Sequence, residues 1–269
     1  MSALTFVAIL TMLLLISASV HDVRSRLVPD VHWKLVCLMA VAAVFFDYRV
    51  ECAAFLAAGY VLLSAYMFSE RLVGVPGIAV VAAGCAVLAV PYLLYSEPSG
   101  LVTAVMFLFM LALYHTGLLR GGGDAKAMMS LSMLLPMYPE GCCILWEPVY
   151  PAAYAFNPVF SIMLLALLIS LLYGIKIACK SREQGGKGFS SYTMTLEEAR
   201  GSFVWPLEDI VDGKKVRIKV GCVPKDAYDR LEAAGVDEVL VTPMIPFVLP
   251  ITIAYIIVLL LGSPLFLLV

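Results

Sequence analysis

Charged residues are scarce in this sequence. They make up 14% of its 269 residues, whereas hydrophobic residues make up 62%. Soluble domains carry about 25% charged residues, so this composition favours an integral membrane protein whose main solvent is the lipid bilayer. Lysine and arginine together number 18 against 20 aspartate and glutamate residues. This near balance provides no broad basic surface, which excludes nucleic acid as a partner.

The sequence also lacks a C-x-x-C pair and has only three histidines. Its seven cysteines are scattered, mostly through apolar stretches, and none has partner histidines at zinc spacing. We interpret the adjacent Cys142 and Cys143 as packing residues, and His21, His32 and His115 as ordinary interfacial histidines. The sequence therefore predicts no metal, no cofactor and no disulfide framework.

The first apolar run, at 4–20, has no basic residue before it, and Arg24, Arg26 and Lys34 follow it. A cleaved leader has the opposite polarity, so we interpret this run as a retained first span. Because lysine and arginine accumulate on cytoplasmic loops, the loop after it is expected to be cytoplasmic.

Long apolar runs recur along the chain. A bilayer core of about 30 Å needs roughly 20 helical residues, and the run at 125–137 reaches only some 20 Å. The basic loops alternate correctly only if this short run also crosses, which places both chain ends outside. The sequence predicts an all-α polytopic membrane protein of about six to eight transmembrane helices, with candidates at 4–20, 33–47, 52–69, 76–95, 101–119, 125–137, 159–178 and 244–262.

Residues 180–242 differ from the rest of the chain. They hold 10 of the 18 basic and 11 of the 20 acidic residues, which indicates a small water-exposed α/β insert on the cytoplasmic side. "DGKKVRIKV" predicts a turn and a strand, "PKDAYDRLEAAG" a helix closed by glycine, and "VDEVLVTP" a second strand. The expected organisation is a membrane domain at 1–179, the insert at 180–242 and a last membrane helix at 243–269.

Two acidic residues lie at expected cytoplasmic ends of spans. In "GLLRGGGDAKAMMSLSMLLP" three glycines, Gly121, Gly122 and Gly123, allow a tight turn with positive φ before Asp124. Asp124 is expected in the first turn of a helix, whose dipole stabilises an anion. Asp22, in "SVHDVRSRLVPDVHWKL", closes the first span. Each feature alone is ordinary, but a carboxylate near membrane depth is costly and tends to be functional.

Together these residues resemble a family. Asp22 in "HDVRSRLVPD", followed by a G-x-G-D at 121–124 with "AK" after it, is similar to the membrane aspartyl proteases that process type IV prepilins and archaeal preflagellins. "VTPMIPFVLPI" is similar to the stretch with which archaeal members enter their last span. The bacterial members carry a tetracysteine zinc loop that this chain lacks.

The resemblance implies an aspartic endopeptidase with Asp22 and Asp124 as its catalytic pair, acting at the cytoplasmic face of the plasma membrane. The implied substrate is a prepilin or preflagellin precursor with a short basic leader and an apolar helix. Arg24, Arg26, Arg120 and Lys126 are expected to surround the pair and either lower its pKa or follow the positive-inside bias. Gly121, Gly122 and Gly123 would let the backbone approach an extended substrate strand.

Two other readings are open. One is a protease related to presenilin and signal peptide peptidase, although those carry the first aspartate inside a span and Asp22 is followed at once by a basic loop. The other is a transporter that uses Asp22 and Asp124 to bind protons or cations. A cleavage assay with purified protein separates these readings.

Overall fold

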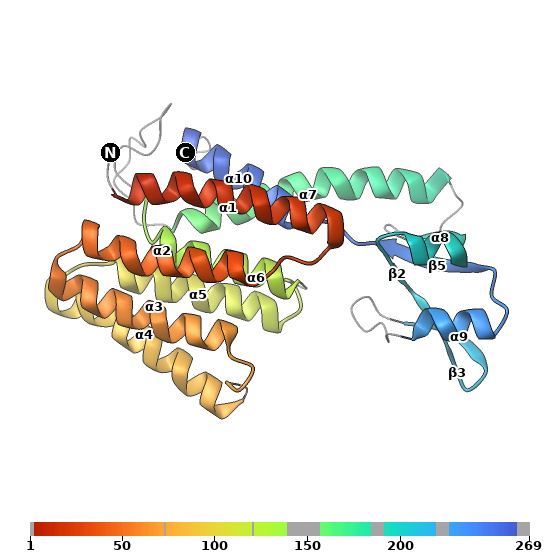
Figure 1. The fold of residues 1–269 in the computed structure, drawn as a ribbon, viewed down its shortest axis with the longest axis horizontal. Helices are drawn as coiled ribbons and strands as arrows, with labels where there is room; N and C mark the ends of the chain where they lie inside the picture. The colour runs from red at the N-terminus through yellow and green to blue at the C-terminus, as the bar shows by residue number, and fades with distance from the viewer. Residues whose placement is uncertain are drawn as a thin grey trace. The chain divides into compact units, whose positions relative to one another are not determined.

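A computed structural model gives the arrangement of the chain (Figure 1). The structure is mostly helical and divides into two compact units, formed by Met1–Ala166 with Phe247–Val269 and by Leu167–Pro246. It describes residues 3–72, 74–119, 121–138, 157–183, 191–218 and 226–262. Cys142, Cys143 and Arg120 lie outside these ranges.

Apolar helices form the first unit, and a helix occurs at every position where the sequence predicts a span. Their bounds differ from the expected ones by a few residues, because hydropathy does not detect the polar last turns of a helix. They are α1 (Ala3–Ser25), α2 (Val31–Asp47), α3 (Val50–Phe68), α4 (Val75–Tyr95), α5 (Ser99–His115), α6 (Gly122–Leu134), the start of α7 (Pro158–Glu183) and α10 (Val248–Leu261).

Helices α2 to α6 pack around one another. From α2 to α5, each helix contacts the next one along the chain. Helix α6 lies against both α5 and α2, and α1 lies between α2 and α10. Helices α3 and α4 approach each other closely, since a Cβ at Gly59 would come within 2.5 Å of Leu88. Small residues allow this proximity, as is usual between membrane helices. Tyr60, Phe107 and Met128 are fully buried in this unit.

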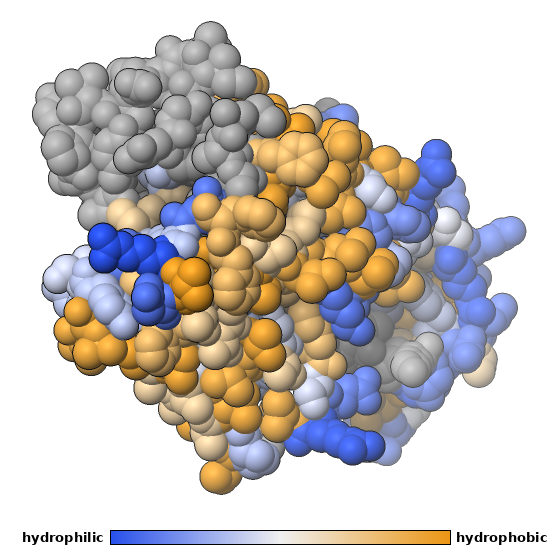
Figure 2. All heavy atoms as spheres, turned by 60° about the vertical axis from the view of Figure 1, so that its left-hand side comes forward, coloured by the Kyte–Doolittle hydropathy of each residue, from blue (hydrophilic) through white to orange (hydrophobic). Residues whose placement is uncertain are grey.

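Four of the described helices are long and apolar enough to cross a membrane. These candidate spans are Phe6–Ser25, Val50–Phe68, Val75–Tyr95 and Pro158–Cys179, and α5 and α10 are apolar but shorter. The predicted number of six to eight spans is therefore not confirmed. Figure 2 shows a face on which apolar side chains predominate.

The apolar character of the surface extends to individual helices. Phe46, Leu93 and Leu172 are 77%, 76% and 69% exposed, respectively. Water does not tolerate such surfaces over several helices, whereas lipid does. The helices and their surface are consistent with a membrane protein.

The second unit contains two small antiparallel sheets. In the larger sheet β5 pairs with β1 on one side and β2 on the other, and in the smaller β3 pairs with β4. Leu231, Val239 and Val241 are fully buried in its core. The elements are β1 (Tyr192–Thr195), α8 (Leu196–Gly201), β2 (Val204–Pro206), β3 (Glu208–Val211), β4 (Lys214–Arg217), α9 (Ala227–Ala233) and β5 (Glu238–Pro243).

The sequence predictions for this unit are confirmed where its turn signals are strong. The turn at Asp212 and Gly213 leads into β4, and Gly235, with φ of 67°, follows the end of α9. The sequence reasoning missed β1, β2, β3 and α8. These elements are three to six residues long, too short to show a period.

An ion pair between the buried Asp209 and the partly exposed Arg230 joins α9 to β3. Arg230 Nη2 contacts Asp209 Oδ2 at 2.6 Å, and the Asp209 side chain is 3% exposed. The hydrogen bonds from Arg230 hold the pKa of Asp209 below its ordinary value. The ion pair stabilises the folded unit only while Asp209 is ionised. Its contribution to stability is therefore lost as pH falls below about 4.

We expect Arg230→Met to destabilise the second unit far more than Arg200→Met. The first substitution leaves the Asp209 carboxylate buried without its cation, which is costly. Arg200 binds Asp229 and Glu232, whose side chains are 71% and 68% exposed, and such surface pairs contribute less than about 1 kcal/mol. Hydrogen exchange of the β3 and β5 amides in the full chain is the measurement, and equal exchange in both variants would contradict the assignment.

Candidate active site

Asp22 lies in the last turns of α1. The helix ends immediately after it, because Arg26 adopts a left-handed conformation with φ of 55°. The backbone N–H of Arg26 and its guanidinium both donate to the carbonyl oxygen of Asp22, at 3.0 and 3.1 Å. The carboxyl side chain of Asp22 is directed into the protein and is only 8% exposed.

The Asp22 carboxylate meets the start of α10. The backbone N–H of Val248, the first residue of that helix, donates to Asp22 Oδ2 at 3.0 Å. The first N–H groups of a helix have no partner within it, and the positive end of the helix dipole favours an anion there. A group 226 residues away in the sequence thus stabilises the charge of Asp22.

A buried pair of hydroxyls fixes α1 against α10 one turn before Asp22. Ser19 Oγ and Thr252 Oγ1 are 2.7 Å apart, and Thr252 also donates to the carbonyl of Leu15. Both hydroxyl side chains are almost fully buried. Unpaired polar groups are costly in such an environment, so these bonds hold the two helices in one register. That register places the Val248 N–H beside Asp22.

Asp124 occupies the first turn of α6, as the sequence predicts. None of Gly121, Gly122 and Gly123 has positive φ, so the expected use of these glycines was wrong; the left-handed glycine nearby is Gly117, with φ of 74°. Gly121 serves a different purpose. A Cβ built on it would lie 2.1 Å from Asp124 Oδ2, whereas one on Gly123 meets nothing within 4 Å. The Asp124 carboxylate therefore packs directly on the Gly121 backbone.

The two carboxylates are close enough to interact electrostatically. Asp124 lies outside the four candidate spans, and its pKa is raised by burial and by the negative charge of Asp22. Two carboxylates that interact in this way oppose each other's ionisation.

The basic residues expected around this pair differ in where they lie. Lys126 Nζ binds both carboxylate oxygens of Asp30, at 2.8 and 2.7 Å, and so joins the α1–α2 loop to α6. Arg24 is exposed at the end of α1. Arg26 lies beside Asp22, as expected, whereas sequence reasoning identified neither the Lys126–Asp30 pair nor the Val248 contact.

The histidines have other roles. His32 is buried and its ring bonds Ser17 Oγ and the carbonyl of Pro29, each at 3.1 Å. It also meets the His21 ring at a centroid distance of 5.5 Å. Across the described parts of the chain, no three histidine, cysteine, aspartate or glutamate side chains gather as a metal site would require.

The features to compare with known proteins are the apolar helices and the two aspartates at helix ends. The chain is 28% identical over 152 residues to the preflagellin peptidase of Methanocaldococcus jannaschii, in a match that covers 53% of this chain and 63% of the relative. No family model matches the chain. The similarity is distant and supports a prepilin or preflagellin peptidase-like family.

Proposed function

We propose that this protein is an intramembrane-type aspartyl endopeptidase with Asp22 and Asp124 as its catalytic pair. The single observation that carries the proposal is that the charge of Asp22, at the end of α1, helps raise the pKa of Asp124, at the start of α6. The similarity to a protein named preflagellin peptidase supports the same reaction class. Aspartate pairs that share one proton are the working unit of aspartic proteases.

The proposed reaction needs no covalent intermediate. The ionised aspartate takes a proton from a water molecule, whose oxygen attacks the scissile carbonyl carbon, while the protonated aspartate donates a hydrogen bond to the carbonyl oxygen. Collapse of the tetrahedral intermediate breaks the C–N bond, and the departing nitrogen takes a proton from the pair. The atoms of the water molecule are thus divided between the new carboxyl and amino ends.

The contact with α10 suggests how the roles are divided. The Val248 N–H and the dipole of α10 stabilise negative charge on Asp22. Asp124, whose pKa is raised by burial and by Asp22, retains the proton. We therefore assign Asp22 as the base and Asp124 as the acid of the resting pair.

The proposed substrate is a prepilin or preflagellin precursor with a short basic leader followed by an apolar helix. Cleavage takes place at the cytoplasmic face of the plasma membrane, in a chain of six to eight spans whose basic loops lie on that side. The exposed Arg24 belongs to this basic surface, and neither a metal nor a cofactor takes part.

The decisive experiment is cleavage of such a precursor by the purified protein in detergent, with the cut site determined by mass spectrometry. Release of the intact leader supports the proposal. A cut deep within the apolar segment would favour the presenilin-like reading, and proton-coupled flux in liposomes without proteolysis would favour the transporter.

The cleavage rate should show a bell-shaped dependence on pH. Activity falls at low pH because Asp22 becomes protonated, and it falls at high pH because Asp124 loses its proton. Ordinary aspartates titrate at about 3.9. Because the pKa of Asp124 is raised, the alkaline decline of the cleavage rate should lie above pH 4. Initial rates across pH test this, with Asp30→Asn as the variant that leaves both limbs in place. A rate that only rises with pH would remove the protonated partner from the mechanism.

A further inference from the structure

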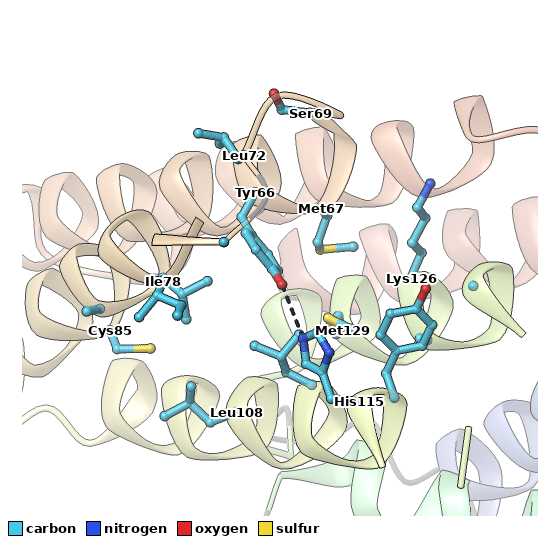
Figure 3. A pocket seen from close by; sticks show the side chains of 17 residues that line it. Tyr66, Met67, Ser69, Leu72, Ile78, Cys85, Leu108, His115, Lys126 and Met129 are labelled. Carbon is cyan, nitrogen blue, oxygen red and sulfur yellow. Dashed lines mark hydrogen bonds between the residues drawn. The ribbon is translucent and has the colours of Figure 1, made fainter. Parts of the chain in front are cut away.

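A second site lies on the opposite side of α6. A cavity of about 860 Å³ opens between α3, α4, α5 and α6, and Figure 3 shows it from close by. Gly122, Ala125, Lys126 and Met129 line it from α6, and their spacing places them on one face of that helix. Asp124, two residues after Gly122, is turned about 200° away from that residue. The cavity is therefore separate from the proposed catalytic pair.

The cavity is amphipathic along its length. Its apolar part includes Ile78 and Cys85 from the candidate span α4 and Leu108 from the shorter apolar helix α5, which lie together at one side of Figure 3. Its polar groups, among them Tyr66 and His115, come from the ends of α3 and α5. The hydroxyl of Tyr66 and Nε2 of His115 are 3.5 Å apart. A candidate span stops here, so this end of the cavity lies at the depth of lipid headgroups.

A cation, Lys126, stands at the polar end of the cavity. Lys126 lines the cavity, and none of the described lining residues is acidic. The Lys126 ammonium has three N–H donors, and its two contacts with the Asp30 carboxylate leave one for a further acceptor. An apolar channel with hydroxyl donors and an ammonium at its mouth matches one kind of molecule, an amphiphile with an anionic head.

We propose that this cavity binds an anionic phospholipid, with an acyl chain among Ile78, Cys85 and Leu108 and the headgroup phosphate on Lys126. Helices α3 and α4 are both candidate spans, so in a bilayer lipids would border the helices that line the cavity. Because α6 carries the cavity on one face and Asp124 on the other, the bound lipid supports the helix that holds Asp124. Lipid binding itself does not depend on the proposed function.

The free thiol of Cys85 reports on occupancy. Cys85 lines the cavity and is partly exposed, whereas Cys179 is exposed outside it. Delipidated protein in detergent is treated with a membrane-permeable maleimide, and labelling at each cysteine is quantified by peptide mass spectrometry. Phosphatidylglycerol should protect Cys85 and not Cys179, phosphatidylcholine should protect Cys85 only at higher concentration, and inorganic phosphate should not protect it. Unchanged labelling of Cys85 with phosphatidylglycerol would overturn the proposal.

A matched pair of lysines tests the headgroup contact. Lys126 and Lys34 each lie 5.5 Å from the centroid of the Phe68 ring, but only Lys126 is among the residues lining the cavity. Lys126→Gln should weaken protection by phosphatidylglycerol about tenfold, as loss of one charge-assisted contact does, and Lys34→Gln should leave it unchanged. Equal effects of the two variants, or none from Lys126→Gln, would contradict a headgroup site at Lys126.

Discussion

Replacing either aspartate of the pair with asparagine should abolish cleavage of a prepilin-like substrate, with a loss of at least about 10³-fold in kcat. In Asp22→Asn the new amide retains an oxygen that accepts the Val248 N–H, and in Asp124→Asn the side chain keeps nearly the same volume, so both variants should fold and insert. Neither amide can exchange a proton with water at the reacting centre. The assay is leader release from purified protein, accompanied by circular dichroism and size-exclusion chromatography.

Two other aspartates serve as matched controls. Asp30 binds Lys126 with a side chain that is 43% exposed, and Asp47 is exposed at the end of α2. Substituting asparagine at either position should reduce the rate only slightly, because exposed ion pairs contribute less than about 1 kcal/mol. Normal processing by Asp22→Asn or Asp124→Asn would remove that residue from the catalytic role, whatever the controls show.

Gly121→Ala should lower kcat about 100-fold while Gly123→Ala has little effect. The new methyl group at position 121 would stand 2.1 Å from Asp124 Oδ2 and force the carboxylate to move. A displacement of about 1 Å at a reacting group costs on this order. Position 123 has open space, so alanine fits there.

The two glycine variants are a matched test of what the G-x-G-D sequence does. Steady-state kinetics of both variants, with KM determined separately, provide the measurement. KM should change little, because the displaced group acts on the scissile bond. If the two variants lose activity equally, the contact between Gly121 and Asp124 is not what the reaction requires.

Hydropathy predicted the helices well because each apolar run is a local property of the sequence. The number of crossings is harder to predict, since α6 has 13 residues and α10 has 14, and neither reaches the length that a bilayer requires. The short strands β1 and β2 form through pairing with β5, and β3 through pairing with β4, rather than through any pattern of their own. Their existence depends on contacts across the unit.

The groups of the candidate site also divide into those that the sequence indicates and those that it does not. Asp22 and Asp124 stand out in an apolar sequence as charged residues at helix ends. The amide of Val248, by contrast, is a backbone group without any sequence signal, and Thr252 is a hydroxyl within an apolar run. The three glycines predicted a flexible turn, but only packing reveals that Gly121 makes room for a carboxylate. Side-chain chemistry is visible in the sequence, and the backbone partners are not.

The bond between Asp22 and Val248 has a consequence for biosynthesis. The ribosome makes Asp22 early and Val248 only after a further 226 residues, so α1 enters the bilayer long before its partner helix exists. Until α10 is inserted, Asp22 lacks the amide that stabilises its charge. Under the proposed function, a nascent chain would thus lack the complete catalytic pair until the last helix docks.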